Sequence, residues 1–401
     1  MRRPGRPLQP AERAEHMRVL VAIDSMKGSI SSRDAAAAVK AGILSVSSEA
    51  QVDWVPVADG GEGTVETLVS GLGGELIQVN VTGPLGEPVQ AAYGWLPQQQ
   101  TAVFEMAQAS GLPLVPLEKR NPLHTTTRGV GEMLLDALDR GYRRMIIGIG
   151  GSATNDCGIG MLLALGCRFF DDAGQEVAGY GRDVGRIARI DASGLDPRLA
   201  GCEIQVACDV NNPLCGPNGA SAVFGPQKGA TPEIVRQMDA GALRFSQVVK
   251  EATGIDAADA AGAGAAGGLG YALLVFLRAR MGSGISIILD TLRFEEKAAW
   301  ADVVITGEGR LDRQTVMGKV PAGVAEAAKR HGALVVALAG CVTPEARTCN
   351  DHGIDAYFPI LQRPCTEREA MELSQASANL EATAAQVFHL ITACETWRAN
   401  S

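Results

Sequence analysis

The sequence predicts an α/β protein of two domains, in which both chain ends form a parallel-sheet domain and the middle forms a mixed-sheet insertion. Three observations predict this. Strand-like apolar runs alternate with helical patterns near both ends, as in βαβ units. Short runs of alternating polarity follow residue 75, which is typical of hairpins. The length of 401 residues is also large for one compact core.

The first elements follow from apolar runs and the residues that punctuate them. RVLVAI at 18–23 predicts a strand. A helix is expected over 33–46, after a stretch at 31–34 that resembles a capping box. A second strand is expected over 51–57, followed by a helix that ends near Gly71. This order indicates parallel βαβ units.

The middle of the chain changes pattern. From 75 to 105 the runs ELIQVNV, VQAAYGW and TAVFEM are separated by GPLGEP and PQQQ, which predicts hairpins and the entry into a second domain. A helix over 127–140 and a strand over 144–149 are expected next. The segment at 268–281, GYALLVFLRARM with its preceding glycines, is too short to cross a membrane and predicts a buried helix.

The βαβ rhythm resumes after an Ala- and Gly-rich stretch near 257–270. ADVVIT, ALVVALAG and AYFPI predict strands, and PAGVAEAAKRHG predicts a helix with Pro321 in its first turn. A final helix is expected over 366–395. The predicted division is a disordered tail at 1–16, a discontinuous parallel-sheet domain of 17–74 and 290–401, and an inserted domain of 75–289.

Composition excludes several functions. The net charge of -9 and the pI near 5.2 argue against a nucleic acid or an anionic membrane as partner. Nine cysteines without a CxxC pair and only five histidines match no zinc or haem spacing. Reduced thiols and a cytoplasmic location are therefore expected. Nothing in the sequence selects between a monomer and a homo-oligomer.

Five polar, mostly glycine-bearing loops each follow an apolar strand. They are 24–29, 59–64, 150–156, 209–212 and 306–312. Ligands of parallel α/β sheets bind outside the carboxyl ends of the strands. We therefore expect these loops to line one crevice.

The loop GIGGSATNDCGIGM has the composition of an anion site. The amides of Gly150 and Gly151 can approach an anion, and a helix follows them. Ser152 and Thr154 offer hydroxyls to phosphate oxygens, and Asn155 and Asp156 could orient a hydroxyl or a magnesium-bound water. In the alternative interpretation the loop is a turn in which Asp156 caps the next helix. No known fingerprint applies to it.

Acids and cations fill the remaining loops. Asp59 and Glu62 in ADGGEGT suit a metal ion or acceptance of a proton, or else an acidic helix start. Lys27 suits an anion or is simply solvated. In GEGRLD, Arg310 could clamp an anion and the acids Glu308 and Asp312 a metal, or the motif forms a surface ion pair.

Two further motifs are rich in glycine, and the first leaves alternatives open. GAGAAGGLG, with Gly267 and Gly268, is either a nucleotide-binding loop or a place where backbones pack closely. CDVNNPLCGPNGASAVFGPQKGA brings Asp209 and Lys228 among glycine and proline turns. Anion-binding loops with several acids and a few cations fit phosphoryl transfer, in which positioning and charge neutralisation supply most of the catalysis.

The ordered set of motifs resembles the type I glycerate kinases, an ATP-dependent family that phosphorylates D-glycerate. ADGGEGT, GIGGSATND, CDVNNPLCGPNGA, GPQKGA, GAGAAGGLG and ITGEGRLD…GK carry the resemblance, which runs from about Met17 to the C-terminal helix. The resemblance implies a Rossmann- or flavodoxin-like domain, a mixed-sheet insertion and an active site between them. One departure is Cys157, where the family commonly has glycine; the backbone there must tolerate a side chain.

The resemblance favours 2-phosphoglycerate as the product, and within this hypothesis residue type suggests the site roles. The residues expected to hold ATP are Gly150, Gly151, Ser152, Thr154, Asn155, Gly267 and Gly268. Asp209 and Asp312 are expected to hold Mg²⁺. Asp59, Glu62 or Asp156 would accept the hydroxyl proton, and Lys27 or Arg310 would bind the glycerate carboxylate. The three acids are not ranked.

Two other functions fit the same residues. One is a kinase that acts on another small hydroxy acid, such as a tartronate-like or tetronate compound. The other is a non-catalytic sensor of sugar acids built on a Rossmann-like domain. The acidic pI and the lack of a helix-turn-helix signal count against a DNA-binding sensor.

Overall fold

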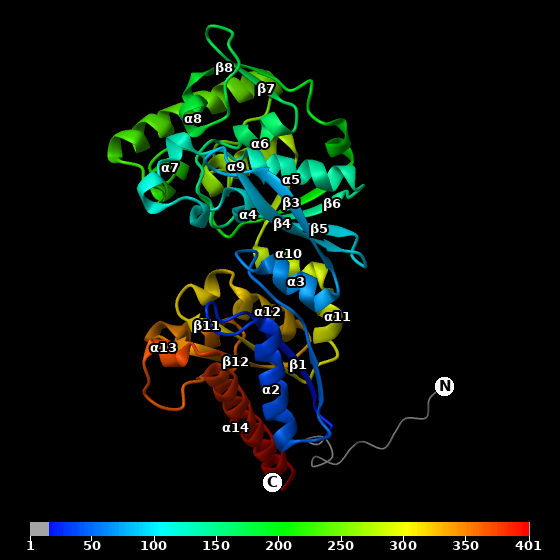
Figure 1. Ribbon diagram of the computed structural model, residues 1–401. Helices are drawn as coiled ribbons and strands as arrows, with labels where there is room; N and C mark the ends of the chain where they lie inside the picture. Colours follow the sequence, from blue (N-terminus) through cyan, green and yellow to red (C-terminus); the bar gives the residue numbers. More distant parts are fainter. Residues whose placement is uncertain (1–15, 401) are drawn as a thin grey trace. The chain divides into compact units, whose positions relative to one another are not determined.

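The structure is a computed structural model that describes residues 16–400, and its chain divides into two compact units (Figure 1). The terminal unit consists of the residues up to Asp59 and those from Ile288 onward. The central unit is Gly60–Ile287. The expected tail at 1–16 lies outside the described residues, apart from its last residue.

The terminal unit is built on a parallel sheet of five strands in the order β13-β12-β11-β1-β2. The strands are β1 (Arg18–Ile23), β2 (Gln51–Trp54), β11 (Val303–Leu311), β12 (Leu334–Val342) and β13 (Ala356–Pro359). Counted along this unit alone, the order is 2-1-3-4-5, as in flavodoxin-like folds. The order reverses between β1 and β11, so their carboxyl ends form the switch point at which such sheets bind ligands.

Two helices from opposite ends of the sequence pack together in the terminal unit. Helix α2 (Ser32–Val46) and helix α14 (Leu373–Asn400) lie side by side (Figure 1); α2 contacts β1, α14 contacts β12, and both share one buried core with the residues of β1. The backbones approach closely: a Cβ added to Gly42 would lie 2.2 Å from the Glu381 carbonyl oxygen. Ser31 caps α2 by accepting a hydrogen bond from the Asp34 amide at 3.1 Å.

The remaining helices of the terminal unit are α11 (Phe294–Ala298), α12 (Val320–Arg330) and α13 (Glu367–Ala370). Pro321 lies in the first turn of α12, as expected. The single helix expected over 366–395 is instead two helices. A capping box between Thr366 and Glu369 starts α13 separately from α14.

The central unit is built on a six-stranded mixed sheet in the order β10-β9-β6-β5-β4-β3. Its strands are β3 (Glu75–Thr82), β4 (Pro88–Leu96), β5 (Thr101–Glu105), β6 (Arg144–Gly148), β9 (Glu203–Ala207) and β10 (Arg280–Gly282). The pairs β3–β4 and β4–β5 are antiparallel, which confirms the expected hairpins, and the other pairs are parallel. A separate two-stranded antiparallel sheet pairs β7 (Arg168–Asp171) with β8 (Ile187–Asp191).

Helices pack on this mixed sheet, and the buried residues of helices and sheet form one continuous hydrophobic core. They are α3 (Thr64–Leu72), α4 (Ala107–Ser110), α5 (Arg128–Asp139), α6 (Ile159–Ala164), α7 (Ala220–Phe224), α8 (Pro232–Thr253) and α9 (Ala265–Phe276), with α10 (Gly284–Thr291) at the boundary. Helix α3 belongs to this unit, although the sequence placed the boundary after residue 74. The reason is packing on β4, where a Cβ added to Gly94 would lie 2.7 Å from Val69 Cγ2.

Helix α9 contains a buried break. Ala266, Gly267 and Gly268 have φ values of 52°, 67° and 86°, so the backbone turns left-handed before the helix continues to Phe276. The expected buried helix over 268–281 therefore starts earlier, and its last residues form β10. Among the described residues, the search for a helix long and apolar enough to span a bilayer found none.

We predict that Gly267→Ala destabilises the protein far more than Gly254→Ala. Both glycines have positive φ, +67° and +74°. A Cβ at Gly267 would lie 2.1 Å from the Thr154 carbonyl oxygen, whereas a Cβ at Gly254 would meet nothing within 4 Å. We expect a loss of about 3 kcal/mol or more at Gly267 and about 1 to 2 kcal/mol at the control. Urea unfolding of both variants measures the difference, and equal losses would contradict the packing argument.

Candidate active site

The glycine-rich loop of the central unit runs from the end of β6 to α6. Two backbone hydrogen bonds fix its start: Leu112 donates to the Gly151 carbonyl at 2.8 Å, and Ala153 donates to the Ser110 carbonyl at 2.9 Å. Gly150 and Gly151 are exposed, whereas residues 152–156 are buried. Within the central unit, an anion can therefore approach this loop at its two glycines and at the edge of Ser152.

Asp156 organises the rest of the loop. Its carboxylate is fully buried and accepts hydrogen bonds from the amide and hydroxyl of Thr127, both at 2.8 Å. It also accepts from the amides of Gly158 at 3.1 Å and Gly160 at 3.2 Å. Burial raises the pKa of Asp156, and these hydrogen bonds oppose that shift. The geometry favours the capping interpretation over proton acceptance.

Four other residues expected to bind nucleotide lie inside the unit. Thr154 and Asn155 are buried, and the hydroxyl of Thr154 and the side-chain oxygen of Asn155 have no hydrogen-bond partner among the described residues. The Asn155 amide donates to Ser221 Oγ at 2.8 Å. Gly267 and Gly268 are also buried, and the Gly267 carbonyl accepts a hydrogen bond from the Cys157 amide at 2.9 Å. These glycines fit the close-packing interpretation, because they support the loop from behind.

Cys157 shows what the loop requires of its backbone. Its φ is +50°, in the left-handed region that favours glycine, and its side chain is buried in the core of the unit. Gly158 follows with a φ of +72° and begins α6 as its N-cap. The chain thus keeps a side chain at a position where glycine would adopt the same conformation with less strain.

Lys228 is a site candidate that the sequence did not select. It ends a 3-10 helix at Pro226–Lys228 and is 2% exposed. Its Nζ donates to Ser152 Oγ at 2.8 Å and to the Thr154 carbonyl oxygen at 2.6 Å. The motif GPQKGA gave no sign of this, since a lysine between glycine and proline residues ordinarily stays in water.

In the terminal unit, Asp24 follows β1 at the switch point of the sheet. It is 9% exposed and accepts a hydrogen bond from the Ser25 amide at 2.7 Å. Burial, and next the negative charge of Asp59, raise the pKa of Asp24 to about 7. Lys27 acts on it in the opposite direction. Asp24, Asp59 and Lys27 thus interact electrostatically at the carboxyl end of β1.

Glu308 lies on the neighbouring strand β11 and adds a second buried acid. Thr315 donates a hydrogen bond to its Oε1 at 2.6 Å, and Lys319 Nζ lies 3.7 Å from its Oε2. Burial raises the pKa of Glu308. The sequence contained a signal for Asp24 and Glu308, because both stand where an apolar run ends. Their burial depends on how neighbouring strands pair.

Three candidates lie a few residues after Asp24 or Glu308 in the sequence and are less buried: Lys27, Arg310 and Asp312. Lys27 and Arg310 are exposed, and Arg310 Nε lies 3.7 Å from Asp312 Oδ2. The expected loop at 306–312 is a strand as far as Leu311, because Thr306 to Leu311 pair with the extended β12. Only Asp312 of this motif belongs to the following loop.

The remaining acids occupy the starts of loops. Glu62 is exposed just before α3, and the nearby Glu105 is buried, accepting a hydrogen bond from the Val65 amide at 2.8 Å. Asp209 accepts from the Gly284 amide at 3.0 Å, and Asp312 accepts from the Gln314 amide at 2.7 Å. The described residues contain no group of three or more His, Cys, Asp or Glu that could hold a metal ion.

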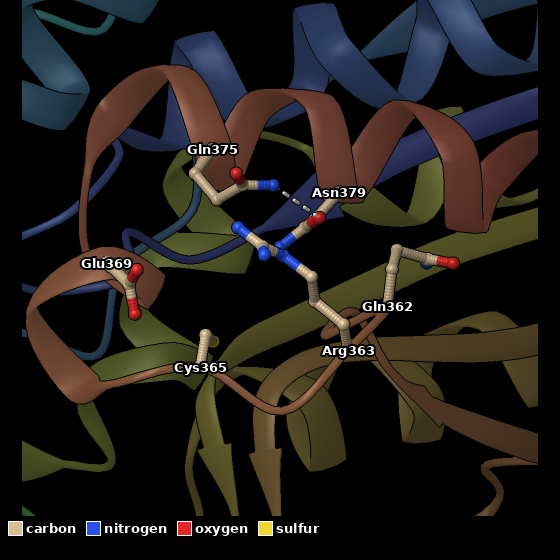
Figure 2. Close-up of a pocket in the computed structure, with 6 residues that line it drawn as sticks. All are labelled: Gln362, Arg363, Cys365, Glu369, Gln375 and Asn379. Carbon is tan, nitrogen blue, oxygen red and sulfur yellow. Dashed lines mark hydrogen bonds between the residues drawn. The ribbon is translucent and has the colours of Figure 1, made fainter.

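A small pocket lies in the terminal unit between the end of β13 and α14. It has a volume of about 60 Å³ and is lined by Gln362, Arg363, Cys365, Glu369, Gln375 and Asn379. Figure 2 shows Arg363 extending towards the amides of Gln375 and Asn379, which hydrogen bond to each other at 2.9 Å. Ligand pockets usually measure about 300 Å³ or more, so this pocket is too small for a nucleotide. None of the residues predicted for the site lines it.

A flavodoxin-like sheet with buried acids at its switch point is typical of an α/β protein that binds its ligand beside the carboxyl ends of its strands. Comparison with known proteins gives the particular family. The sequence matches the glycerate kinase family over residues 19–392. The chain belongs to the glycerate kinase family, and it is a kinase.

Two curated relatives and one solved structure illustrate the similarity. The chain is 50% identical over 371 residues to the glycerate kinase of Bacillus subtilis (strain 168), covering 92% of this chain and 97% of the relative. It is 48% identical over 374 residues to the glycerate 2-kinase of Escherichia coli (strain K12), covering 92% and 98%. A crystal structure of a protein designated glycerate kinase 2 from Salmonella typhimurium LT2 matches with a TM-score of 0.88 at 47% identity, covering 95% of this chain and all of that one.

We predict that Asp24→Asn stabilises the protein more at about pH 8 than at about pH 4. The folded-state pKa of Asp24 is about 7, against an ordinary value of 3.8, so ionisation opposes folding. This cost is absent below about pH 4, grows as the pH rises and is complete above pH 7. We expect a gain on the order of 2 to 4 kcal/mol at the higher pH.

The measurement is urea unfolding of the wild type and the variant at both pH values. Asp351→Asn, which changes an exposed carboxylate of the same unit, serves as the control. A variant with the same stability difference at both pH values would contradict the buried-acid interpretation.

Proposed function

We propose that the chain transfers the γ-phosphoryl group of ATP to the 2-hydroxyl of D-glycerate, giving 2-phosphoglycerate. Membership of the glycerate kinase family supports glycerate as the acceptor. The printed name of the Escherichia coli relative, glycerate 2-kinase, supports the 2-hydroxyl.

The observation that carries the proposal is the accessible edge of the glycine-rich loop. Gly150 and Gly151 are exposed directly after a strand, Ser152 follows, and the Lys228 ammonium lies 2.8 Å behind its hydroxyl. Backbone amides, a hydroxyl and a nearby positive charge are the groups that hold phosphate oxygens. Gly150, Gly151 and Ser152 are therefore our proposed phosphate contacts, with Thr154, Asn155, Gly267 and Gly268 shaping the loop.

The acids and cations take the other roles. We assign proton acceptance from the glycerate hydroxyl to Asp59, which is half-buried, or to Glu62, which is exposed. Asp156 is left out, because its carboxylate already accepts four hydrogen bonds from the loop and α5. Lys27 and Arg310 are both exposed cations that can bind the glycerate carboxylate.

Mg²⁺ would be held by one or two carboxylates together with the phosphates. Mg²⁺ commonly binds in this way and needs no complete protein cage. Asp209 and Asp312 remain our candidates, although Arg310 near Asp312 competes for its carboxylate. The ion would neutralise phosphate charge during transfer.

We also propose that the protein works in the cytoplasm. All nine cysteines are free thiols, which fits a reducing compartment.

We predict a single product when the protein is incubated with D-glycerate, ATP and Mg²⁺. Phosphorus and proton NMR should show the phosphate coupled to the proton on carbon 2. Coupling to the carbon 3 protons would contradict the proposed position, and a panel with tartronate-like and tetronate acceptors tests the substrate.

We predict that Asp59→Asn or Glu62→Gln lowers kcat by about 100-fold or more in the variant that removes the proton acceptor. Glu66→Gln is the matched control and should keep wild-type kcat. Glu66 is an exposed acid in the first turn of α3, the helix that follows the Glu62 loop. Steady-state kinetics with thermal unfolding of each variant separates lost chemistry from lost folding. Full kcat in both variants would remove both residues as candidates.

A further inference from the structure

Lys228 is held in the interior by the turn that carries it. Gly229 follows with a φ of +90°, and a Cβ at this glycine would lie 2.1 Å from the Arg120 carbonyl oxygen. The Lys228 amide donates to the Gly225 carbonyl at 3.0 Å, which closes the 3-10 turn. This packing leaves the Lys228 side chain 2% exposed.

The contacts of the buried ammonium are unusual for a structural lysine. The two partners of Nζ are a hydroxyl, Ser152 Oγ, and a carbonyl, Thr154 O. Burying an ammonium without a hydrogen-bonded carboxylate costs several kcal/mol. Burial accordingly lowers the pKa of Lys228 to about 7.

The charged group that acts on Lys228 from the loop packed against it is Asp156, which raises its pKa. The other polar side chains on that loop and on α7 are neutral: Asn155 donates a hydrogen bond to Ser221, Ser152 accepts one from Lys228, and the hydroxyl of Thr154 has no partner among the described residues. Arg120 meets this turn through its backbone, against Gly229. The positive charge of Lys228 is therefore only partly balanced by its surroundings.

The bond to Ser152 fixes how that hydroxyl is used. A serine hydroxyl has one proton to donate, and here its oxygen already accepts from the ammonium. While Lys228 is protonated, the proton of the Ser152 hydroxyl must point away from Nζ, because an ammonium has no lone pair to accept it. Ser152 is 9% exposed and follows the exposed glycines, so the available direction is towards the accessible edge of the loop.

We infer that Lys228 is a positioning residue for the phosphate-bearing ligand: its ammonium turns the Ser152 hydroxyl into a donor for a phosphate oxygen and places a positive charge beneath the loop at 150–154. This inference rests on the proposed function, because it needs a nucleotide on that loop. An anion bound there favours the charged ammonium. Binding therefore draws a proton from solvent onto Nζ.

Proton uptake by the wild type is the first test. Isothermal titration with the magnesium complex of AMP-PNP, a non-hydrolysable ATP analogue, is carried out at about pH 8 in two buffers that differ in ionisation enthalpy. At this pH Lys228, whose pKa is about 7 in the protein without nucleotide, is mostly neutral, and the phosphate groups of the nucleotide are already ionised. We expect uptake approaching one proton per bound nucleotide.

Variants identify the residue that takes up the proton. Lys228→Met keeps the length of the side chain without the charge; it should take up no proton and should raise the KM for ATP about 10- to 100-fold, with little change in the KM for D-glycerate. Lys228→Arg, whose charge is permanent, should recover part of the affinity without proton uptake. Lys250→Met, which removes an exposed lysine paired with Asp256 in the same unit, should behave as the wild type.

The outcomes separate the two proposals. Nucleotide binding and glycerate phosphorylation without proton uptake, or with uptake unchanged in Lys228→Met, overturn the role of Lys228 and leave the proposed function standing. A wild type that neither binds the nucleotide nor phosphorylates D-glycerate overturns both. If Lys228→Met does not fold, the wild-type titration still decides.

Discussion

The glycine-rich loop depends on one buried carboxylate. Asp156 places its carboxyl group in the interior of the central unit, where burial raises its pKa because an unpaired ion would cost several kcal/mol. Hydrogen bonds from Thr127, Gly158 and Gly160 offset that cost, and they tie the loop to the start of α5 and to α6. With Asp156 fixed, Thr154 and Asn155 are held inside and the two exposed glycines outside. The accessible edge of the loop is thus defined from within.

Each unit buries an ionisable group near a loop, and the pKa values of the two groups shift in opposite directions. In the terminal unit, burial and the charge of Asp59 raise the pKa of Asp24. In the central unit, burial lowers the pKa of Lys228. Both shifts favour the neutral form, so both groups are poised to gain or lose a proton when a charged ligand arrives. This is a property of burial that neither residue type shows by itself.

Much of the fold could be predicted from the sequence, because apolar periodicity decides strands and helices locally. The run RVLVAI became β1 with the predicted bounds, and the alternating runs after residue 75 became antiparallel strands. Pairing decisions could not be predicted in the same way. GEGRL looked like a loop, yet it continues β11 because β12 is long enough to pair with it.

The sequence selects candidate loops by residue type, but residue type does not show how deeply each side chain is buried. Residue type suggested that Thr154, Asp156 and Gly267 touch a ligand, whereas the structure buries all three. Lys228 was passed over for the converse reason, since a charged residue in a turn gives no sign of burial. Depth below the surface arises from contacts between segments far apart in the sequence, and a local motif does not encode it.

The position of β1 has a consequence for synthesis on the ribosome. This strand lies between β2 and β11, and its register with β11 pairs Val19 with Val303. An emerging N-terminal segment holds a strand and a helix that lack one of their neighbours until most of the polypeptide has been made, whereas Gly60–Ile287 is contiguous. The contiguous stretch can complete its own contacts first, and β1, although it is synthesised earlier, is among the last strands to reach its final partners.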